Sequence, residues 1–213
     1  MSVEDSSKLQ DLLEQAQNAR LESRLDEAAH LITEAYRLES NSIPVLMELA
    51  LLHQQRHNWN EAQKFLDIIL SRQPENSQVL FALGHIQQAQ GAYGMALNYW
   101  LKAVEIDPEY AEVWQNIALA HEHLDQLPEA ISAHQKVVVL QPDSARAHRF
   151  LGMAQLDYGL LPAANQCFKQ ALKIEPDNPD NLWQRFFIRA LVGDLPDAWI
   201  DYECRFDLPG RTS

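Results

Sequence analysis

The stretch SQVLFALGHIQQAQGAYGMALNYWLKAVEIDPEY, residues 77–110, carries the pattern that decides the fold. Its Pro108 is one of four prolines that follow one another at intervals of 34 residues, the others being Pro74, Pro142 and Pro176. A constant interval of about 20–50 residues is typical of repeat proteins. In this register the chain divides into six units, which are residues 9–42, 43–76, 77–110, 111–144, 145–178 and 179–212, preceded by an N-terminal extension, residues 1–8.

Small side chains recur at fixed positions of these units. In residues 77–110, unit positions 8, 20 and 27 carry Gly84, Ala96 and Ala103, and the other units up to residue 178 carry mostly Gly or Ala there. Large side chains such as Trp100 and Phe168 occupy position 24. Two antiparallel helices can pack closely only where small side chains let their backbones approach. We therefore predict an all-α fold of about twelve helices, with two helices and a short turn in each unit.

Composition and charge exclude several classes of function. Only 7 of the 213 residues are Gly, which favours helix over sheet. The net charge of −13 repels phosphate backbones and anionic lipid surfaces, so we expect no nucleic-acid partner. The N-terminus has no basic segment followed by an apolar core, and no later apolar run is long enough to span a bilayer. We expect no membrane insertion and a cytoplasmic location.

The sequence offers no pattern that is typical of catalysis. It contains no Gly-rich phosphate loop, no nucleophile elbow and no pair of carboxylates in a predicted cleft. The eight histidines lack the third and fourth donors of a closed zinc site, and we interpret them as packing or rim residues. Cys167 and Cys204 are interpreted as reduced thiols that fill apolar space. We expect no enzyme activity, no cofactor and no metal.

The register resembles that of the tetratricopeptide repeat. That family has Leu at unit position 7, Gly or Ala at 8, Ala at 20 and 27, an aromatic residue at 24 and Pro at 32, and residues 77–110 match nearly every one of these positions. The resemblance covers residues 9–212. It implies a single domain, a right-handed superhelical solenoid of six helix-turn-helix repeats, with the first helix of each repeat lining a concave groove.

The resemblance also implies which residues would line that groove. Family positions 5 and 9 are mostly apolar here, and apolar surfaces that include Met bind amphipathic helices or extended peptides. We therefore expect the groove to bind a peptide or helix of a partner protein, as in an adaptor or assembly scaffold. The predicted groove residues are Leu13, Met47, Leu51, Phe81, His85, Gln115, Asn116, Leu119, Arg146, Arg149, Met153, Trp183 and Phe187.

Two arginines in this set suggest a corner for a carboxylate. Arg146 and Arg149 are expected near Asn116 of the preceding unit, and the planar guanidinium group of arginine binds carboxylates through two hydrogen bonds. The set of residues with which some family members bind an acidic chaperone tail is incomplete here, since Phe81 and Phe150 occupy two of its positions. We therefore do not predict an acidic chaperone tail as the partner.

The C-terminal stretch GDLPDAWIDYECRF, residues 193–206, departs from the repeat pattern. It resembles the last repeat of bacterial tetratricopeptide proteins that continue into a glycosyltransferase-like domain. The predicted junction residues are Trp199, Tyr202, Arg205 and Phe206. They would contact a following domain or cover the final repeat.

Two hypotheses of function remain open at this point. In the first, the chain is an adaptor that binds a partner in its groove and also self-associates through an uncapped C-terminal repeat. In the second, it is the non-catalytic recognition module of a larger enzyme of the glycosyltransferase type.

Overall fold

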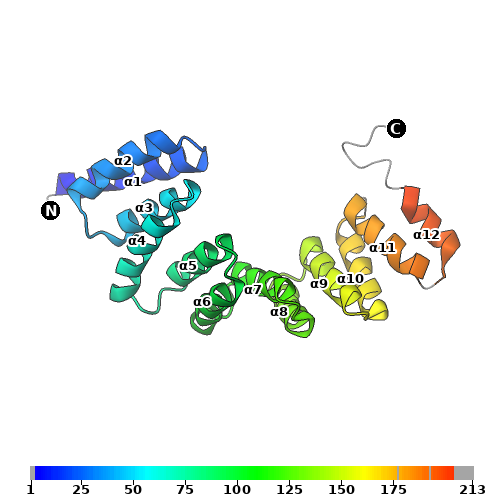
Figure 1. The fold of residues 1–213 in the computed structure, drawn as a ribbon. Helices are drawn as coiled ribbons and strands as arrows, with labels where there is room; N and C mark the ends of the chain where they lie inside the picture. The colour runs from blue at the N-terminus through cyan, green and yellow to red at the C-terminus, as the bar shows by residue number, and fades with distance from the viewer. Residues whose placement is uncertain (1–2, 177, 192, 204–213) are drawn as a thin grey trace. The chain divides into compact units, whose positions relative to one another are not determined.

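A computed structural model describes residues 3–176, 178–191 and 193–203. Over these residues the chain is all-helical and contains no strand, which confirms the predicted fold class. The twelve described helices follow one another in pairs (Figure 1). They are α1 (Val3–Leu21), α2 (Leu25–Leu38), α3 (Ile43–Gln55), α4 (Trp59–Arg72), α5 (Ser77–Ala89), α6 (Tyr93–Ile106), α7 (Ala111–His123), α8 (Leu127–Leu140), α9 (Ala145–Asp157), α10 (Leu161–Ile174), α11 (Pro179–Leu191) and α12 (Leu195–Tyr202).

Each odd-numbered helix packs against the helix that follows it. The helices α3, α5, α7, α9 and α11 begin at residues 43, 77, 111, 145 and 179, where the 34-residue register starts each unit. The first helix, α1, begins at Val3, so residues 3–8 of the predicted N-terminal extension are helical. The chain forms two compact units that divide between Asp107 and Pro108. That residues 9–212 form a single domain stays a prediction.

The turn inside each pair has the same backbone conformation. The residue at unit position 15 has a positive φ in all six pairs, and three of these residues are glycines, Gly91, Gly159 and Gly193. Ser23 and His57 adopt φ values of 60° and 58° at this position, and Asp125 one of 56°. A left-handed residue after a helix ends it and redirects the chain. The repeat therefore imposes this conformation even on residues that adopt it less readily than glycine.

Unit positions 8 and 24 are in close contact in the third repeat, residues 77–110. A Cβ atom added to Gly84 in α5 would lie 2.1 Å from Nε1 of Trp100 in α6, which is closer than two non-bonded atoms can approach. Trp100 is fully buried, and its Nε1 donates a hydrogen bond to the carbonyl oxygen of Phe81 at 3.2 Å. The fifth repeat is similar, since a Cβ on Gly152 would lie 2.7 Å from Cε1 of Phe168. In these two repeats, a side chain larger than that of glycine at position 8 would overlap the ring at position 24.

Buried side chains from successive pairs join the repeats of the first unit. One cluster contains Leu46 of α3, Leu66 of α4 and Leu83 of α5, each almost without exposure. Polar contacts accompany it, since Gln54 Nε2 in α3 donates to the carbonyl oxygen of Ala82 in α5 at 2.9 Å. Within the first unit each repeat therefore buries its apolar face against the next one, as expected for a solenoid.

We predict that Gly84→Ala lowers the free energy of unfolding by about 1–3 kcal/mol, because the added methyl group overpacks the contact with Trp100. Gly94→Ala is the matched control. Gly94 lies in α6, and a Cβ atom added there would meet no other atom within 4 Å, so the same change should stabilise the helix by about 0.5–1 kcal/mol. Urea unfolding followed by circular dichroism measures both, and equal effects of the two substitutions would contradict the packing argument.

Candidate functional site

The first candidate surface lies on α1, α3 and α5, where α1 contacts α3 and α3 contacts α5. We call it the first inner face. It carries five of the predicted groove residues, and each of them is half-buried. They are Leu13, Met47, Leu51, Phe81 and His85. These side chains are thus held in place by packing while part of their surface stays accessible.

The first inner face contains a hollow of about 370 Å³ between α1 and α3. Leu13 and Met47, predicted from family position 5, both line it. The other lining residues are absent from the predicted set. They are Gln10, Glu14, Gln17, Pro44 and Glu48. The sequence signal that could have found them is the helical spacing, since residues 10, 13, 14 and 17 lie on one side of a helix.

An ion pair sets the charge of this hollow. Arg20 Nε in α1 donates to Glu48 Oε2 in α3 at 2.8 Å, and Arg20 Nη2 lies 3.4 Å from Glu48 Oε1. Their side chains are only 11% and 15% exposed. No cation among the described residues pairs with Glu14, which is exposed at the edge of the hollow. Glu14 therefore carries the uncompensated charge there.

Phe81 and His85 on α5 are positioned by the core beneath them. Their ring centroids are 4.4 Å apart in an edge-to-face arrangement, and the His85 ring lies 5.7 Å from that of the buried Trp100. His85 Nδ1 lies 3.3 Å from Gln88 Oε1. This end of the first inner face is therefore an aromatic surface with little freedom to rearrange.

The second candidate surface comprises the predicted groove residues of α7, α9 and α11. We call it the second inner face. Arg146 and Phe187 are exposed, and the other members are half-buried. The second inner face consists of Gln115, Asn116, Leu119, Arg146, Arg149, Met153, Trp183 and Phe187.

The two arginines of the expected carboxylate corner have different environments. Arg149 Nη1 donates to Asp180 Oδ2 at 2.9 Å, so a carboxylate of this chain already occupies it. Both guanidinium carbons lie over the ring of Phe150, at 5.3 Å for Arg146 and 5.8 Å for Arg149. No carboxylate of the described residues pairs with Arg146. The corner that includes Asn116 stays a prediction.

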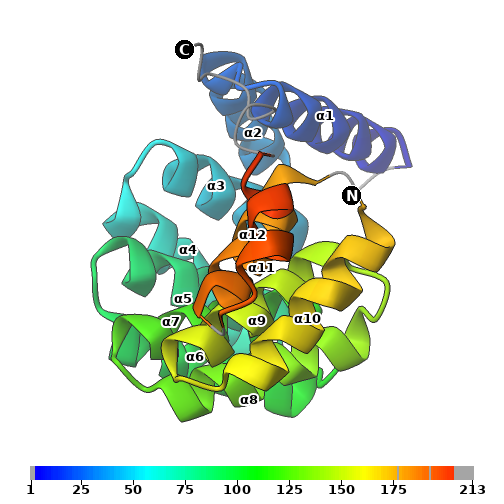
Figure 2. The same ribbon diagram turned by 90° about the vertical axis from the view of Figure 1, so that its right-hand side faces the viewer.

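Aromatic rings gather between α11 and α12, which lie side by side (Figures 1 and 2). The rings of Phe186 and Tyr202 are 5.1 Å apart, and so are those of Trp199 and Tyr202. Trp183 contacts Phe186 at 5.3 Å. Two of the predicted junction residues, Trp199 and Tyr202, are therefore in contact, while Arg205 and Phe206 lie outside the described residues.

The fully buried histidine of α8 serves packing. His134 in α8 is fully buried, its Nε2 lies 2.9 Å from Glu122 Oε1, and its ring stacks on that of Phe150 at 6.0 Å. Within the described residues no three His, Cys, Asp or Glu side chains come together in a way that could hold a metal ion.

None of the described helices has the length and hydropathy needed to cross a bilayer.

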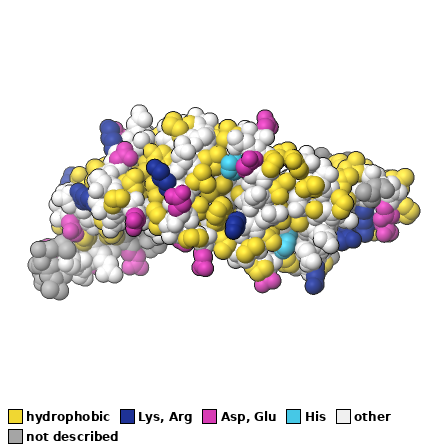
Figure 3. All heavy atoms as spheres, turned by 90° about the horizontal axis from the view of Figure 1, so that it is seen from below, with side chains coloured by type: hydrophobic (Ala, Val, Ile, Leu, Met, Phe, Trp, Pro, Cys, Tyr) yellow, Lys and Arg dark blue, Asp and Glu magenta, His cyan; other side chains and the backbone are white. Residues whose placement is uncertain are grey.

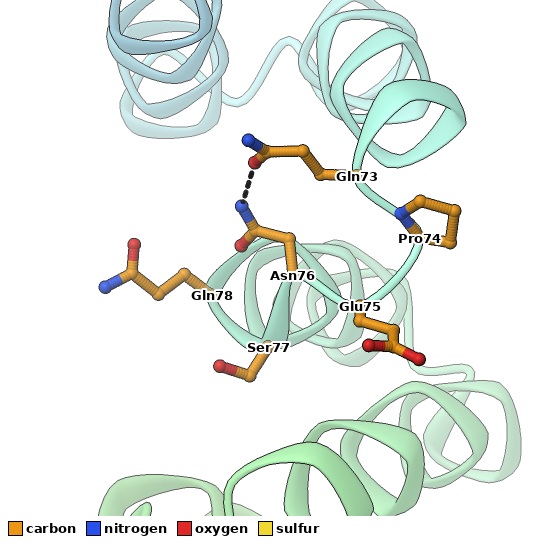
Figure 4. Close-up of a pocket in the computed structure, with 6 residues that line it drawn as sticks. All are labelled: Gln73, Pro74, Glu75, Asn76, Ser77 and Gln78. Carbon is orange, nitrogen blue, oxygen red and sulfur yellow. Dashed lines mark hydrogen bonds between the residues drawn. The ribbon is translucent and has the colours of Figure 1, made fainter.

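A larger hollow, of about 640 Å³, lies at the loop between α4 and α5 (Figure 4). It is lined by residues 73–78, which are the loop and the first two residues of α5, and none of them belongs to the predicted site. Asn76 Nδ2 donates to Gln73 Oε1 at 2.9 Å, and Asn76 Oδ1 accepts a hydrogen bond from the Val79 amide at 3.0 Å. The polar groups of Asn76 thus cap α5. Helix capping therefore accounts for the polar contact of Asn76 with the Val79 amide in this hollow.

On the face drawn in Figure 3, acidic, basic and hydrophobic side chains are interspersed. Hydrophobic side chains form several groups on this face, and apolar atoms contribute more than half of the surface of ordinary folded proteins. The hollow between α1 and α3 combines a concave shape with apolar and charged lining residues.

Comparison with known proteins decides the family. Tetratricopeptide repeat profiles match residues 19–86, 77–110, 99–132 and 117–179, which together form one continuous stretch. The chain belongs to the tetratricopeptide repeat family. This tetratricopeptide repeat chain is 24% identical over 204 residues to the BBSome complex member BBS4 homolog of Drosophila melanogaster, a match that covers 95% of the chain and 42% of that protein. The chain spans less than half the length of the first curated relatives that it matches.

Solved structures share the tetratricopeptide repeat fold. The chain is similar to Pseudomonas aeruginosa PilF, with a TM-score of 0.81 and 16% identity over 97% of this chain and 95% of that one. It is also similar to YrrB, described as a TPR protein with an unusual peptide-binding site. That comparison gives a TM-score of 0.69 and 18% identity, and covers 83% of this chain and 91% of the other. At these identities the likeness shows the fold alone.

We predict that Asn181→Val raises the free energy of unfolding by about 1–3 kcal/mol. Asn181 is fully buried, and no described residue makes a hydrogen bond with its side-chain amide. Val45, Val79 and Val113 occupy the same unit position in other repeats and are equally buried.

Asn178→Ala is the matched control for this stability measurement. Asn178 precedes α11, and its Oδ1 accepts hydrogen bonds from the amides of Asp180 and Asn181 at 3.0 and 3.4 Å. Its loss should destabilise the helix by about 1 kcal/mol. Hydrogen exchange of α11 distinguishes the two variants, and a loss of protection in Asn181→Val would show that the buried amide has a partner.

We predict that Cys167 reacts slowly with thiol reagents. Burial raises the pKa of its thiol from the usual 9.0 to about 11, and Sγ donates to Gln155 Oε1 at 3.3 Å. The thiolate fraction at pH 8 is then about 100-fold below that of the unfolded chain. In a Cys204→Ser background, Cys167 of the folded chain should react with Ellman's reagent at least about 100-fold more slowly than Cys167 of the chain unfolded in urea. The exposed variant Ser40→Cys, with both native cysteines replaced, is the control, and an equally fast reaction of Cys167 would contradict the prediction.

Proposed function

We propose that this chain is a protein-binding module whose first inner face receives a peptide or helix of a partner protein. The observation that carries the proposal is the hollow between α1 and α3, which Leu13 and Met47 both line. Apolar area that a partner covers there contributes about 25 cal/mol per Å². Met47 has an unbranched side chain that adapts its shape to the surface it contacts. The hollow can thus accept an apolar side chain without rearrangement of the backbone.

Fixed polar groups around the hollow support the same function. Binding sites combine an apolar floor with a few polar groups that orient the ligand. Gln10 and Gln17 present exposed amides beside Leu13, and amides can donate to and accept from a peptide backbone. The ion pair of Arg20 with Glu48 holds α1 against α3, so the two walls of the hollow keep their spacing. The site is therefore largely formed before a partner arrives.

The second inner face is a further contact surface in this proposal. Its exposed Phe187 and the neighbouring Trp183 have ring centroids 5.0 Å apart. Exposed aromatic rings held by their neighbours are favourable contact residues at protein interfaces. That YrrB is described as having a peptide-binding site adds support from the same fold.

Two other roles were expected from the sequence of the last repeat. Assembly through a C-terminal repeat that self-associates, and service as the recognition module of a glycosyltransferase-type enzyme, both rest on residues 193–206. Two of the four junction residues, Arg205 and Phe206, lie outside the described part of the chain. We assign no reaction to this chain, and propose that it acts through binding.

Site-specific photocrosslinking in the native cell tests the proposal. A photoreactive amino acid placed at Met47, Leu51 or Phe81 should crosslink to a partner protein, because these side chains are half-buried on the first inner face. Met95 and Lys102 are exposed on α6 and provide the matched positions away from that face. We expect partner adducts from the first set at least several-fold above those from the second. Equal adducts from both sets, or adducts only from α6, would contradict the proposed function.

A further inference from the structure

We propose that the hollow between α1 and α3 binds a lysine or arginine side chain of the partner, so that the segment recognised by the first inner face is basic. This inference rests on the proposed function and names the chemistry of the partner. Three observations carry it, which are the shape of the hollow, the composition of its lining and the pairing of the charges around it.

The hollow fits a long aliphatic side chain with a polar end. Leu13 and Met47 supply apolar surface from the two facing helices, and Pro44 extends that surface along α3. Lysine and arginine pack their methylene groups along such surfaces while the charged end reaches a polar partner. Glu14 lies one residue after Leu13 and lines the same hollow. A side chain lying on Leu13 can therefore reach a carboxylate.

The charges of the hollow favour a cation over an anion. Its two charged lining residues, Glu14 and Glu48, are both acidic. Glu48 is neutralised by Arg20, whose guanidinium group makes both of the contacts described above and is only 11% exposed. Glu14 has no such cation within the described residues. One negative charge thus remains for a ligand to pair with.

The field of the whole chain acts in the same direction. The net charge of −13 attracts basic segments and speeds their encounter with the protein. The second inner face differs, since Arg146 is exposed there over the ring of Phe150. A cationic side chain is consequently directed to the first inner face and not to the second.

Short peptides of defined charge test this inference on the full chain. The probes are acetylated, amidated pentapeptides, Gly-Leu-X-Leu-Gly, with lysine, arginine, norleucine or glutamate at X. Norleucine keeps the aliphatic stem of lysine and removes the ammonium group. Two-dimensional ¹H–¹⁵N NMR should show saturable shifts of the Leu13, Glu14 and Met47 amides with the lysine and arginine peptides. These two should bind about three- to tenfold more tightly than the norleucine peptide, and the preference should fall as salt is added.

Substitutions then locate the preference for a cation. Glu14→Gln should abolish the advantage of lysine over norleucine. Glu105→Gln removes the same charge from an exposed site on α6 and should leave that advantage intact. Leu13→Ala should weaken the lysine and norleucine peptides alike, since it removes the apolar contact they share.

The outcomes separate this inference from the proposed function. Equal binding of the lysine and norleucine peptides, preferred binding of the glutamate peptide, or no saturable shift on α1 and α3 with any peptide in the millimolar range would overturn the basic-segment inference. Photocrosslinking from Met47 and Phe81 would still be observed in those cases if the first inner face binds partners. Loss of crosslinking there would instead overturn the proposed function.

Discussion

The contact between unit positions 8 and 24 is the constraint on which each helix pair depends. In the second, third and fifth repeats the sizes of the two side chains are matched, since Trp100 and Phe168 face glycines while the smaller Leu66 lies in one cluster with Ala50. Two helices can only approach to the distance that this pair of side chains allows. The same contact orients the first helix of each pair, because its position 8 must point at its partner. The residues on its other side are then free to form the inner faces.

This geometry accounts for the position of the predicted groove residues, which all lie on the odd-numbered helices. Unit positions 5 and 6 differ from repeat to repeat, with Leu, Met, Phe, Gln, Arg and Trp at position 5 and Glu, Ala, Asn, Phe and Gln at position 6. Leu13, Glu14, Met47 and Glu48 all occupy these two positions. The packing of α1 against α3 brings them to one hollow. The lining of this hollow thus comes from unit positions that the repeat pattern does not fix.

The periodic part of the structure could be predicted from sequence, because the same packing problem is solved in every repeat. Helices α3, α5, α7, α9 and α11 begin where the register places them. Contacts between repeats were not predictable in this way. The pairs Arg20 with Glu48 and Arg149 with Asp180 join residues 28 and 31 positions apart, and their rotamers depend on how one pair stacks on the next. The charge of the hollow follows from such a pair, so it could be recognised only in the structure.

The sixth repeat shows what happens when the constraint is relaxed. Positions 8 and 24 carry Phe186 and Tyr202 there, two large rings whose centroids lie 5.1 Å apart. Ring contacts therefore replace the close backbone approach of the other pairs. Position 22, which carries His, Lys, Asn, Ser or Gln in the first five units, carries Ile200, and its side chain is 68% exposed. This repeat thus departs from the pattern both inside the pair and on its outer surface, and the stacking of the solenoid accounts for neither change.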